Sequence, residues 1–217
     1  VPTLRDFHAE LLRQPEPEAR DVALAIELFT EGSLNTFAKP TNVDTNSRIL
    51  CYDIRDLGKQ LLPVGMLVVL DSVFNRIIRN RRLGRSTWVY IDEIYLLFQH
   101  EYSANFLFTL WKRVRKYGAC CTGLTQNVDD LLQSHTARTM LANSEFLVML
   151  NQASTDRAEL ARLLNISDNQ LSYITNVDFG RGLIKCGSAI VPFMDHFPKN
   201  NLYRLMSTKP SEADAAV

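Results

Sequence analysis

The stretch Ser86-Thr-Trp-Val-Tyr-Ile-Asp-Glu-Ile-Tyr-Leu-Leu-Phe98 places a short apolar run directly before two carboxylates. The run, residues 87–91, is rich in β-branched and aromatic side chains, and it ends at Asp92 and Glu93. This length and composition are typical of a strand that is buried on both faces, as the strands of parallel sheets are. Because parallel sheets bind their ligands at the carboxyl ends of their strands, the sequence predicts that both acids lie at a ligand-binding edge.

Helical and strand-like segments alternate along the rest of the chain. Apolar residues recur at helical spacing in residues 3–13, 19–29, 63–82, 101–117, 128–134, 136–143, 155–164 and 167–174. Strand-like runs occupy residues 48–54, 87–91, 119–125 and 145–150, and a hairpin around Gly187 pairs residues 181–184 with 188–193. This order predicts an α/β fold with a mainly parallel sheet and a terminal antiparallel hairpin. We expect residues 1–34 to end a helical subdomain, 35–200 to form the core, and 201–217 to be a polar tail.

The composition is that of a soluble globular protein, with 217 residues of which 46% are hydrophobic and 22% charged. The formal net charge is zero, so no overall field attracts nucleic acid. Cys51, Cys120, Cys121 and Cys186 show no C-x-x-C spacing, and we expect buried, reduced thiols. The longest apolar run, residues 61–70, is too short to span a bilayer. The four histidines lack the spacing of metal ligands.

Five side chains around the acid pair have the chemistry of phosphoryl transfer. This reaction needs a metal clamp, a positioned water and a cation that meets the charge developing on the γ-phosphate. Asp92 suits the magnesium ligand, and Glu93 suits the group that orients or deprotonates the water. Gln126 ends the next predicted strand, where its amide can bond to water or phosphate. Arg115, on the intervening helix, is our candidate for an arginine finger toward a neighbouring subunit, with Arg113 in reserve.

Each of these features also has an ordinary structural explanation. An acid pair can simply end a strand, a Gln can cap a helix, and basic residues at the carboxyl end of a helix complement its dipole. The same dipole argument applies to the arginines that end the helix predicted at 63–82. For these a contact with acidic lipid, nucleic acid or a partner subunit is the alternative. They are Arg76, Arg79, Arg81, Arg82 and Arg85.

With these residues in place, the chain resembles the large ATPases of type IV secretion and conjugation systems, the TraC- and TrwK-like class of the HerA/FtsK superfamily. The matching pieces follow the family's order from about residue 30 to 195 and cover most of the chain. They are Thr41-Asn-Val-Asp44, Trp88-Val-Tyr-Ile-Asp-Glu93, Arg115-Lys-Tyr-Gly118, Gly123-Leu-Thr-Gln126 and Gly182-Leu-Ile-Lys-Cys-Gly187.

The resemblance implies a RecA-like P-loop NTPase core that uses ATP and Mg²⁺. It implies that Asp92 and Glu93 form the Walker B pair, with Asp92 at the metal. Gln126 would be the polar sensor that contacts the nucleotide, and Arg115 would hold the arginine-finger position. It further implies a homo-oligomer, a hexamer in the family, on the cytoplasmic face of the bacterial inner membrane. There it would work with other type IV secretion components and power pilus assembly or substrate transfer.

One departure from the family concerns the phosphate loop, G-x-x-x-x-G-K-[ST], which does not occur in this sequence. Gly58-Lys59 lacks the earlier glycine and is followed by Gln60 instead of a hydroxyl residue. We therefore expect this sequence to be the carboxy-terminal part of such an ATPase. Alone, it should bind ATP weakly or not at all. Two alternatives stay open. One is a DNA-translocating coupling ATPase of the same superfamily, against which the neutral charge counts. The other is a degenerate, non-hydrolytic RecA-like scaffold, which would need none of the candidate residues.

Overall fold

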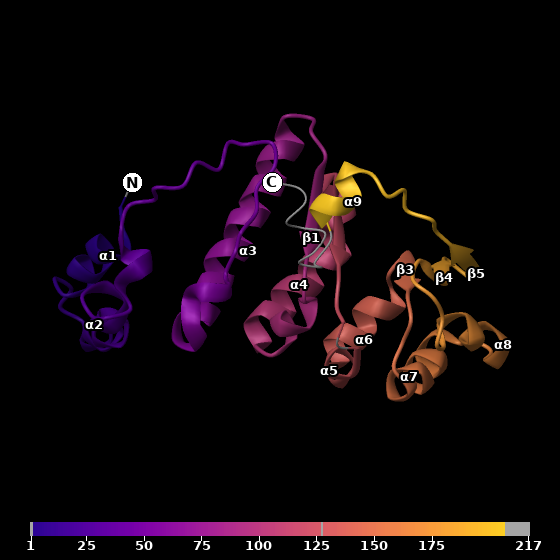
Figure 1. Ribbon diagram of the computed structural model, residues 1–217. Helices are drawn as coiled ribbons and strands as arrows, with labels where there is room; N and C mark the ends of the chain where they lie inside the picture. Colours follow the sequence, from indigo (N-terminus) through magenta and orange to yellow (C-terminus); the bar gives the residue numbers. More distant parts are fainter. Residues whose placement is uncertain (1, 127, 207–217) are drawn as a thin grey trace. The chain divides into compact units, whose positions relative to one another are not determined.

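The computed structural model describes residues 2–126 and 128–206 (Figure 1). The chain divides into two compact units within helix α3, residues 58–82. The first unit ends at Val69 and the second begins at Leu70. The domain boundary predicted at residues 34–35 stays a prediction. The elements of the first unit are α1 (Leu4–Leu11), α2 (Pro17–Thr30), the 3-10 turns η1 (Asn35–Ala38) and η2 (Arg55–Leu57), and the first half of α3 (Gly58–Arg82).

The two opening helices confirm the helical pattern of the first thirty residues, and their starts have clear local causes. Thr3 begins α1 with a capping box. Its side chain accepts a hydrogen bond from the backbone N–H of Asp6, and the Asp6 carboxylate accepts one from the N–H of Thr3 at 2.6 Å. Pro17 is the first residue of α2. A backbone N–H at this position has no partner within the helix, so the N–H that proline lacks is not needed there.

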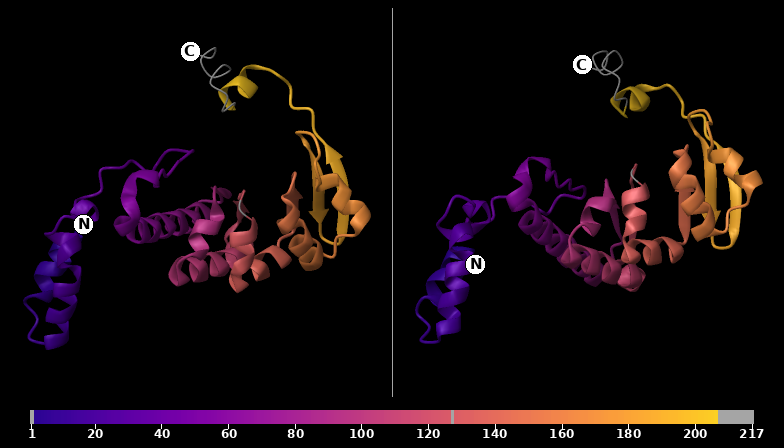
Figure 2. Two further views of the ribbon diagram at one scale, coloured as in Figure 1. Left: turned by 60° about the horizontal axis from the view of Figure 1, so that its bottom comes forward. Right: turned by 90° about the horizontal axis from the view of Figure 1, so that it is seen from below.

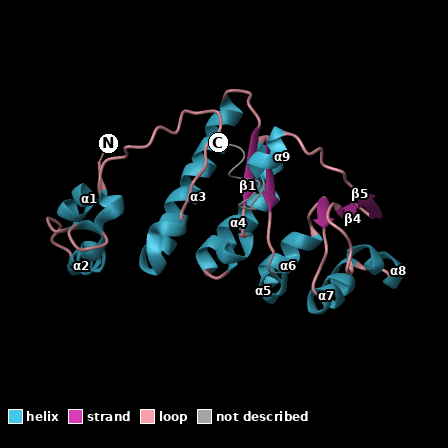
Figure 3. Cartoon of the chain, in the orientation of Figure 1, coloured by secondary structure: helices cyan, strands magenta, loops and turns pink. Residues whose placement is uncertain are grey.

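The strand predicted at residues 48–54 is wrong. These residues form irregular chain leading into α3, drawn as loop in Figure 3, and Ile49 is 86% exposed. A strand needs a hydrogen-bonded neighbour, and within the described residues this segment pairs with no other strand. At its end the guanidinium of Arg55 donates to both oxygens of Asp53, and these bonds lower the pKa of the Asp53 carboxyl to about 2.

The second unit contains the parallel pair that the sequence predicts. Strand β1 (Thr87–Ile91) pairs with β2 (Ala119–Gly123) in register, from Thr87 opposite Ala119 to Ile91 opposite Gly123. The crossover between them consists of the 3-10 turn η3 (Ile94–Phe98), helix α4 (Glu101–Arg113) and the 3-10 turn η4 (Val114–Tyr117). Gly118 ends η4 with a left-handed φ of 64°, which glycine adopts without strain.

Only one face of this parallel pair is covered. Ile77 of α3 and Leu110 of α4 pack with Ala119 of β2 in a small core. On the opposite face Trp88 is 65% exposed and Tyr90 is 67% exposed. The prediction that β1 is buried on both faces is therefore wrong in this chain, because α3 and α4 pack on the same side of the pair.

The later part of the second unit is built around an antiparallel sheet in the order β3-β4-β5. Figure 2 shows the hairpin of β4 and β5 with α7 and α8 alongside. The strand predicted at residues 145–150 thus forms β3 and pairs antiparallel with the hairpin. The elements are α5 (Val128–Gln133), α6 (His135–Ala142), β3 (Phe146–Met149), α7 (Ser154–Leu164), α8 (Asp168–Leu171), the turn η5 (Ser172–Ile174), β4 (Arg181–Cys186), β5 (Ala189–Met194) and α9 (Asn201–Met206).

Apolar side chains from one face of the antiparallel sheet and from its helices form the larger core. Its buried members are Val128, Leu132, Met149, Leu160, Leu164, Ile166, Ile174 and Leu183. Gly187 turns the hairpin with a φ of 57°, as predicted. Residues 201–206 of the predicted polar tail form α9, and residues 207–217 lie outside the described residues. The fold is mixed α/β, as the alternation of elements predicts.

Helix α3 is longer and more apolar than the sequence analysis predicts from the run at residues 61–70. The helical segment from Arg55 to Arg82 has 28 residues, and the mean hydropathy of its most apolar window is 1.7, with 22% of that window buried. Length and composition alone would let it cross a membrane, contrary to the prediction from residues 61–70. Core helices meet the same criterion, and the second half of α3 does pack in a core, where Ile77 is fully buried.

Candidate functional site

Asp92 and Glu93 follow the last residue of β1, at the carboxyl end of the parallel pair, as the sequence predicts. The Asp92 side chain is exposed, and its Oδ1 accepts a hydrogen bond from the backbone N–H of Glu93 at 3.1 Å. This bond fixes the turn that leaves the strand. One carboxylate oxygen of Asp92 thus helps to shape the backbone, while the residue as a whole faces solvent.

Glu93 has an unusual backbone and an unusual side chain. Its φ of 47° and ψ of 48° lie in the left-handed region, which costs a residue with a Cβ roughly 1–2 kcal/mol. Its Oε2 is buried and has no hydrogen-bond partner among the described residues. Buried polar atoms are nearly always bonded, so an unpartnered carboxylate oxygen indicates a water or ligand position. Strain and an unpartnered buried acid together are typical of a functional site.

The ends of β1 and β2 are joined by two backbone hydrogen bonds. The N–H of Leu124 donates to the carbonyl of Ile91 at 2.8 Å, and the N–H of Ile94 donates to the carbonyl of Leu124 at 2.9 Å. Gly123 permits this close approach, because a Cβ there would lie 2.5 Å from Cδ1 of Ile94. The chain after β2 therefore runs beside the turn that carries the acid pair, and it brings the exposed Gln126 to the same edge.

Arg115 and Arg113 lie at the opposite edge. Both precede β2, at the end of α4 and in η4, and both are exposed. The five residues of β2 span about 16 Å at roughly 3.3 Å per residue, which is more than an arginine side chain reaches. The structure therefore places Asp92, Glu93 and Gln126 after the carboxyl ends of the two strands, and it places both arginines at the opposite ends.

A magnesium ion fits the Asp92 edge by the chemistry of its donors. Mg²⁺ is usually held by one or two carboxylates, several waters and the phosphates of its nucleotide. The described residues contain no cluster of three His, Cys, Asp or Glu side chains that could hold a metal on its own. A single exposed carboxylate beside the unpartnered Oε2 of Glu93 is consistent with an ion that arrives with a nucleotide.

Sequence reasoning missed the residues that assemble this edge. Gly123 and Leu124 entered only as part of a family-like stretch, and their contact with Ile94 was not predicted. The signal for it was a glycine inside the strand predicted at residues 119–125, which often marks close backbone approach. The expectation of buried thiols is also wrong for most cysteines. Cys51, Cys120 and Cys186 are exposed, and all four are free. Cys120 points to the uncovered face of β2, while the alternate residue, Cys121, points to the core.

Comparison with known proteins agrees with this architecture. The model of the TraG P-loop domain family matches residues 39–181, well over half of the chain. No curated protein matches. A solved structure of VirB4 from Thermoanaerobacter pseudethanolicus superposes with a TM-score of 0.73 at 24% identity, over 90% of this chain and 54% of that one.

The chain thus spans about half the length of that VirB4 structure, and the likeness confirms the α/β fold. The family match confirms the resemblance to the ATPases of type IV secretion and conjugation. The chain belongs to the TraG P-loop domain family.

Proposed function

We propose that this chain supplies the hydrolytic edge of an ATPase that powers pilus assembly or substrate transfer in type IV secretion or conjugation. The observation that carries the proposal is Glu93. It follows the parallel strand in a strained left-handed conformation, with a buried carboxylate oxygen that no described residue satisfies. A scaffold without hydrolysis gains nothing from either feature, because both lower the stability of the fold.

The described residues divide the chemistry among themselves. A bound Mg²⁺ would supply positive charge to the phosphates, and Asp92 would hold it directly or through water. Oε2 of Glu93 would orient the attacking water and accept its proton. Gln126, at the same edge, would hydrogen-bond to water or phosphate. The cation that meets the developing charge would be Arg115, or Arg113, of a neighbouring subunit, because neither reaches its own acid pair.

The proposal includes the setting that the family resemblance implies. The protein would act as a homo-oligomer, a hexamer, at the cytoplasmic face of the bacterial inner membrane, together with other secretion components. The separation of the arginines from the acids supports an oligomer, since a complete site then needs two copies. A DNA-translocating coupling ATPase of the same superfamily is the second candidate. The net charge of zero counts against it, but residues 72–91 and 102–128, which contain nine Lys and Arg and no Asp or Glu, favour it.

Substitution of Glu93→Gln in the full-length protein tests the assignment. The amide keeps the shape of the side chain but cannot accept a proton, so hydrolysis should fall at least about a hundredfold while ATP binding persists. Glu101→Gln is the matched control, because Glu101 is exposed at the start of α4 and has no proposed role. Turnover by the Glu93→Gln protein equal to that of the control would refute the assignment.

A further inference from the structure

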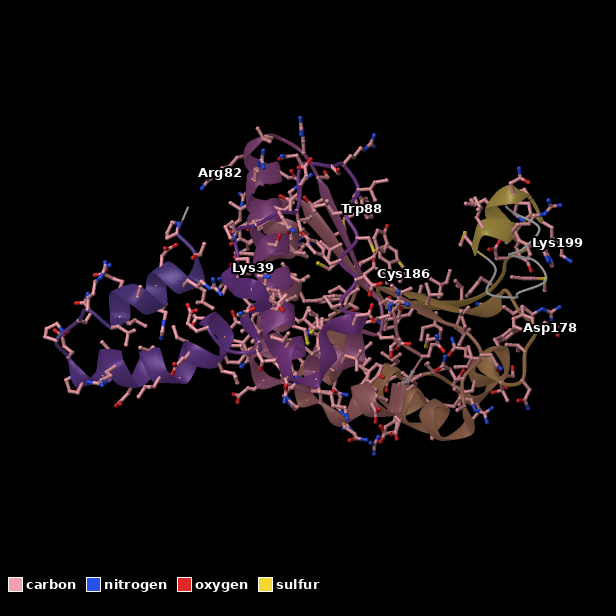
Figure 4. The ribbon with its side chains drawn as sticks, turned by 60° about the vertical axis from the view of Figure 1, so that its left-hand side comes forward. Lys39, Arg82, Trp88, Asp178, Cys186 and Lys199 are labelled. Carbon is pink, nitrogen blue, oxygen red and sulfur yellow. The ribbon has the colours of Figure 1, made fainter. Side chains whose placement is uncertain are left out.

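The turn that carries Glu93 is bonded to the end of β2 on both sides of the acid pair. Strand β1, on which Figure 4 labels Trp88, is followed directly by the two acids. The backbone N–H of Leu124 donates to the carbonyl before them, that of Ile91. The carbonyl of Leu124 accepts from the N–H after them, that of Ile94. Any movement of the chain at Leu124 relative to η3 therefore acts on the acid pair.

A side-chain contact fixes the distance between the same two segments. Ile94 is the first residue of η3 and is buried, and its side chain lies against Gly123, the last residue of β2. A Cβ at Gly123 would lie 2.5 Å from Cδ1 of Ile94, 3.3 Å from Cγ2 and 3.4 Å from Cβ. Helices α4 and α5 also lie against η3, so the isoleucine has little room to turn away.

Glycine is needed at position 123 for space and not for its backbone conformation. Gly123 is not among the glycines with a positive φ, so an alanine could adopt its backbone conformation without strain. The contact with Ile94 is what excludes a side chain. Ordinary van der Waals contact begins at 3.4 Å, so a methyl group placed 2.5 Å from Cδ1 would have to retreat by about 0.9 Å. That displacement falls on the hydrogen bonds that bracket the acid pair.

We propose that Gly123 and Ile94 are positioning residues for hydrolysis, and that their contact holds Glu93 where its Oε2 reaches the attacking water. The inference rests on the proposed role of Glu93 as the general base. A general base has to lie within about 2.6–3.2 Å of the group whose proton it accepts. Small movements of the turn therefore change the rate of the chemical step more than the binding of the nucleotide.

The strained backbone of Glu93 makes such support necessary. At a φ of 47° and a ψ of 48°, a residue with a Cβ relaxes to an ordinary conformation unless its surroundings prevent it. The surroundings that prevent it are Ile94, through its contact with Gly123, and Leu124, through its two hydrogen bonds. Neither Gly123 nor Ile94 contains a group that could take part in the reaction, so both act through Glu93.

Turnover of ATP by variants of the full-length protein tests the proposal. Gly123→Ala adds a methyl group toward Ile94. It should lower kcat at least about tenfold and leave the KM for ATP unchanged, because a misplacement of about 1 Å can cost about a hundredfold in rate. Ile94→Val removes the Cδ1 atom that the methyl group meets. Gly123→Ala/Ile94→Val therefore conserves the packed volume, and it should recover the kcat of the matched control, Ile94→Val.

Hydrogen exchange in the absence of nucleotide gives a readout that does not depend on turnover. The amides of Ile94 and Leu124 are bonded between η3 and the end of β2. Gly123→Ala should speed their exchange, and the double variant should restore it, while the amides of β4 and β5 exchange as in the unmodified protein. Circular dichroism verifies that each variant folds. If Gly123→Ala does not fold, Ile94→Ala replaces it, since it removes the same contact from the other side and should also lower kcat at unchanged KM.

Each outcome decides the proposal. Gly123→Ala, or Ile94→Ala in its place, with the kcat of the unmodified protein would overturn it. A loss in Gly123→Ala that Ile94→Val does not relieve would overturn it too, because the loss then does not pass through the contact. The two proposals fail in distinguishable ways. Unchanged turnover in Glu93→Gln removes the general base and this inference with it, whereas lost turnover in Glu93→Gln beside normal turnover in Gly123→Ala removes only the positioning role.

Discussion

At the scale of single residues, the left-handed conformation of Glu93 offers a direct test of whether stability is sacrificed for function. Glycine adopts φ of 47° without strain and removes the buried, unpartnered carboxylate. Glu93→Gly should therefore raise the free energy of unfolding by roughly 1 kcal/mol while hydrolysis is lost.

The measurement is the urea concentration at the midpoint of unfolding of Glu93→Gly. It is compared with the midpoint of Glu93→Gln, provided that free energy falls with urea at the same slope in both variants. The glutamine variant loses the charge but keeps a side chain on the strained backbone. The difference between the two variants therefore measures what the left-handed φ contributes to the free energy of unfolding. A Glu93→Gly protein that unfolds at lower urea than Glu93→Gln would show that the turn is not strained and that its conformation carries no functional meaning.

The sequence predicts the place of Asp92 and Glu93 but not their conformation. An apolar run before two acids is a local pattern, so it can be recognised without knowledge of the fold. The left-handed turn depends on the two hydrogen bonds between Leu124 and the chain around Ile91 and Ile94. These residues lie about thirty positions apart, and no local pattern encodes that contact.

At the scale of elements, strand β2 predicts different reactivity for two adjacent thiols. Cys120 is exposed on the uncovered face, whereas burial raises the pKa of Cys121 to about 12. Because the thiolate is the reactive form, iodoacetamide at about pH 8 should modify Cys120 at least tenfold faster than Cys121 in the folded chain. Mass spectrometry of the alkylated peptides measures both rates.

The same shift predicts the direction of a pH effect. The pKa of Cys121 in the folded chain lies above the ordinary thiol value of 9.0, so the stability that comes from burying this thiol in its neutral form is fully present below pH 9.0. It declines as the pH rises toward 12. Equal alkylation of the two cysteines in folded protein would contradict the assigned faces of β2.

Elements with both ends marked by local signals are the ones that the sequence predicts well. Residues 87–91 match β1, and the glycine turn at Gly187 places the hairpin. Ser167 and Gln170 form a capping box at the start of α8, within the helix predicted at residues 167–174. Residues 48–54 have a strand-like composition but no partner among the described residues, and composition alone cannot supply one. For the same reason the sequence did not reveal that one face of β1 is uncovered.

At the scale of the whole molecule, the second unit has opposite charge at the two ends of its parallel strands. Asp92 and Glu93 follow the carboxyl end of β1, and Arg113, Arg115 and Lys116 precede the amino end of β2. A surface that is complementary to a different surface of the same chain favours head-to-tail association, which closes into rings. In such a ring, Arg115 of one copy can meet the acid pair of the next.

Mixing two inactive proteins tests this arrangement. A full-length Arg115→Ala protein keeps Glu93 but lacks the finger, and Glu93→Gln keeps Arg115 but lacks the base. In an equal mixture that exchanges subunits at random, about one quarter of the junctions combine an intact Glu93 with an intact Arg115, so about one quarter of the unmodified rate should return.

Energy transfer between labelled subunits verifies the exchange. A mixture of Arg115→Ala with the doubly substituted Glu93→Gln/Arg115→Ala protein should stay inactive, since no junction regains both groups. Exchange without recovered hydrolysis would exclude Arg115 as a group supplied between copies and would transfer that role to Arg113, for which the same mixture can be prepared.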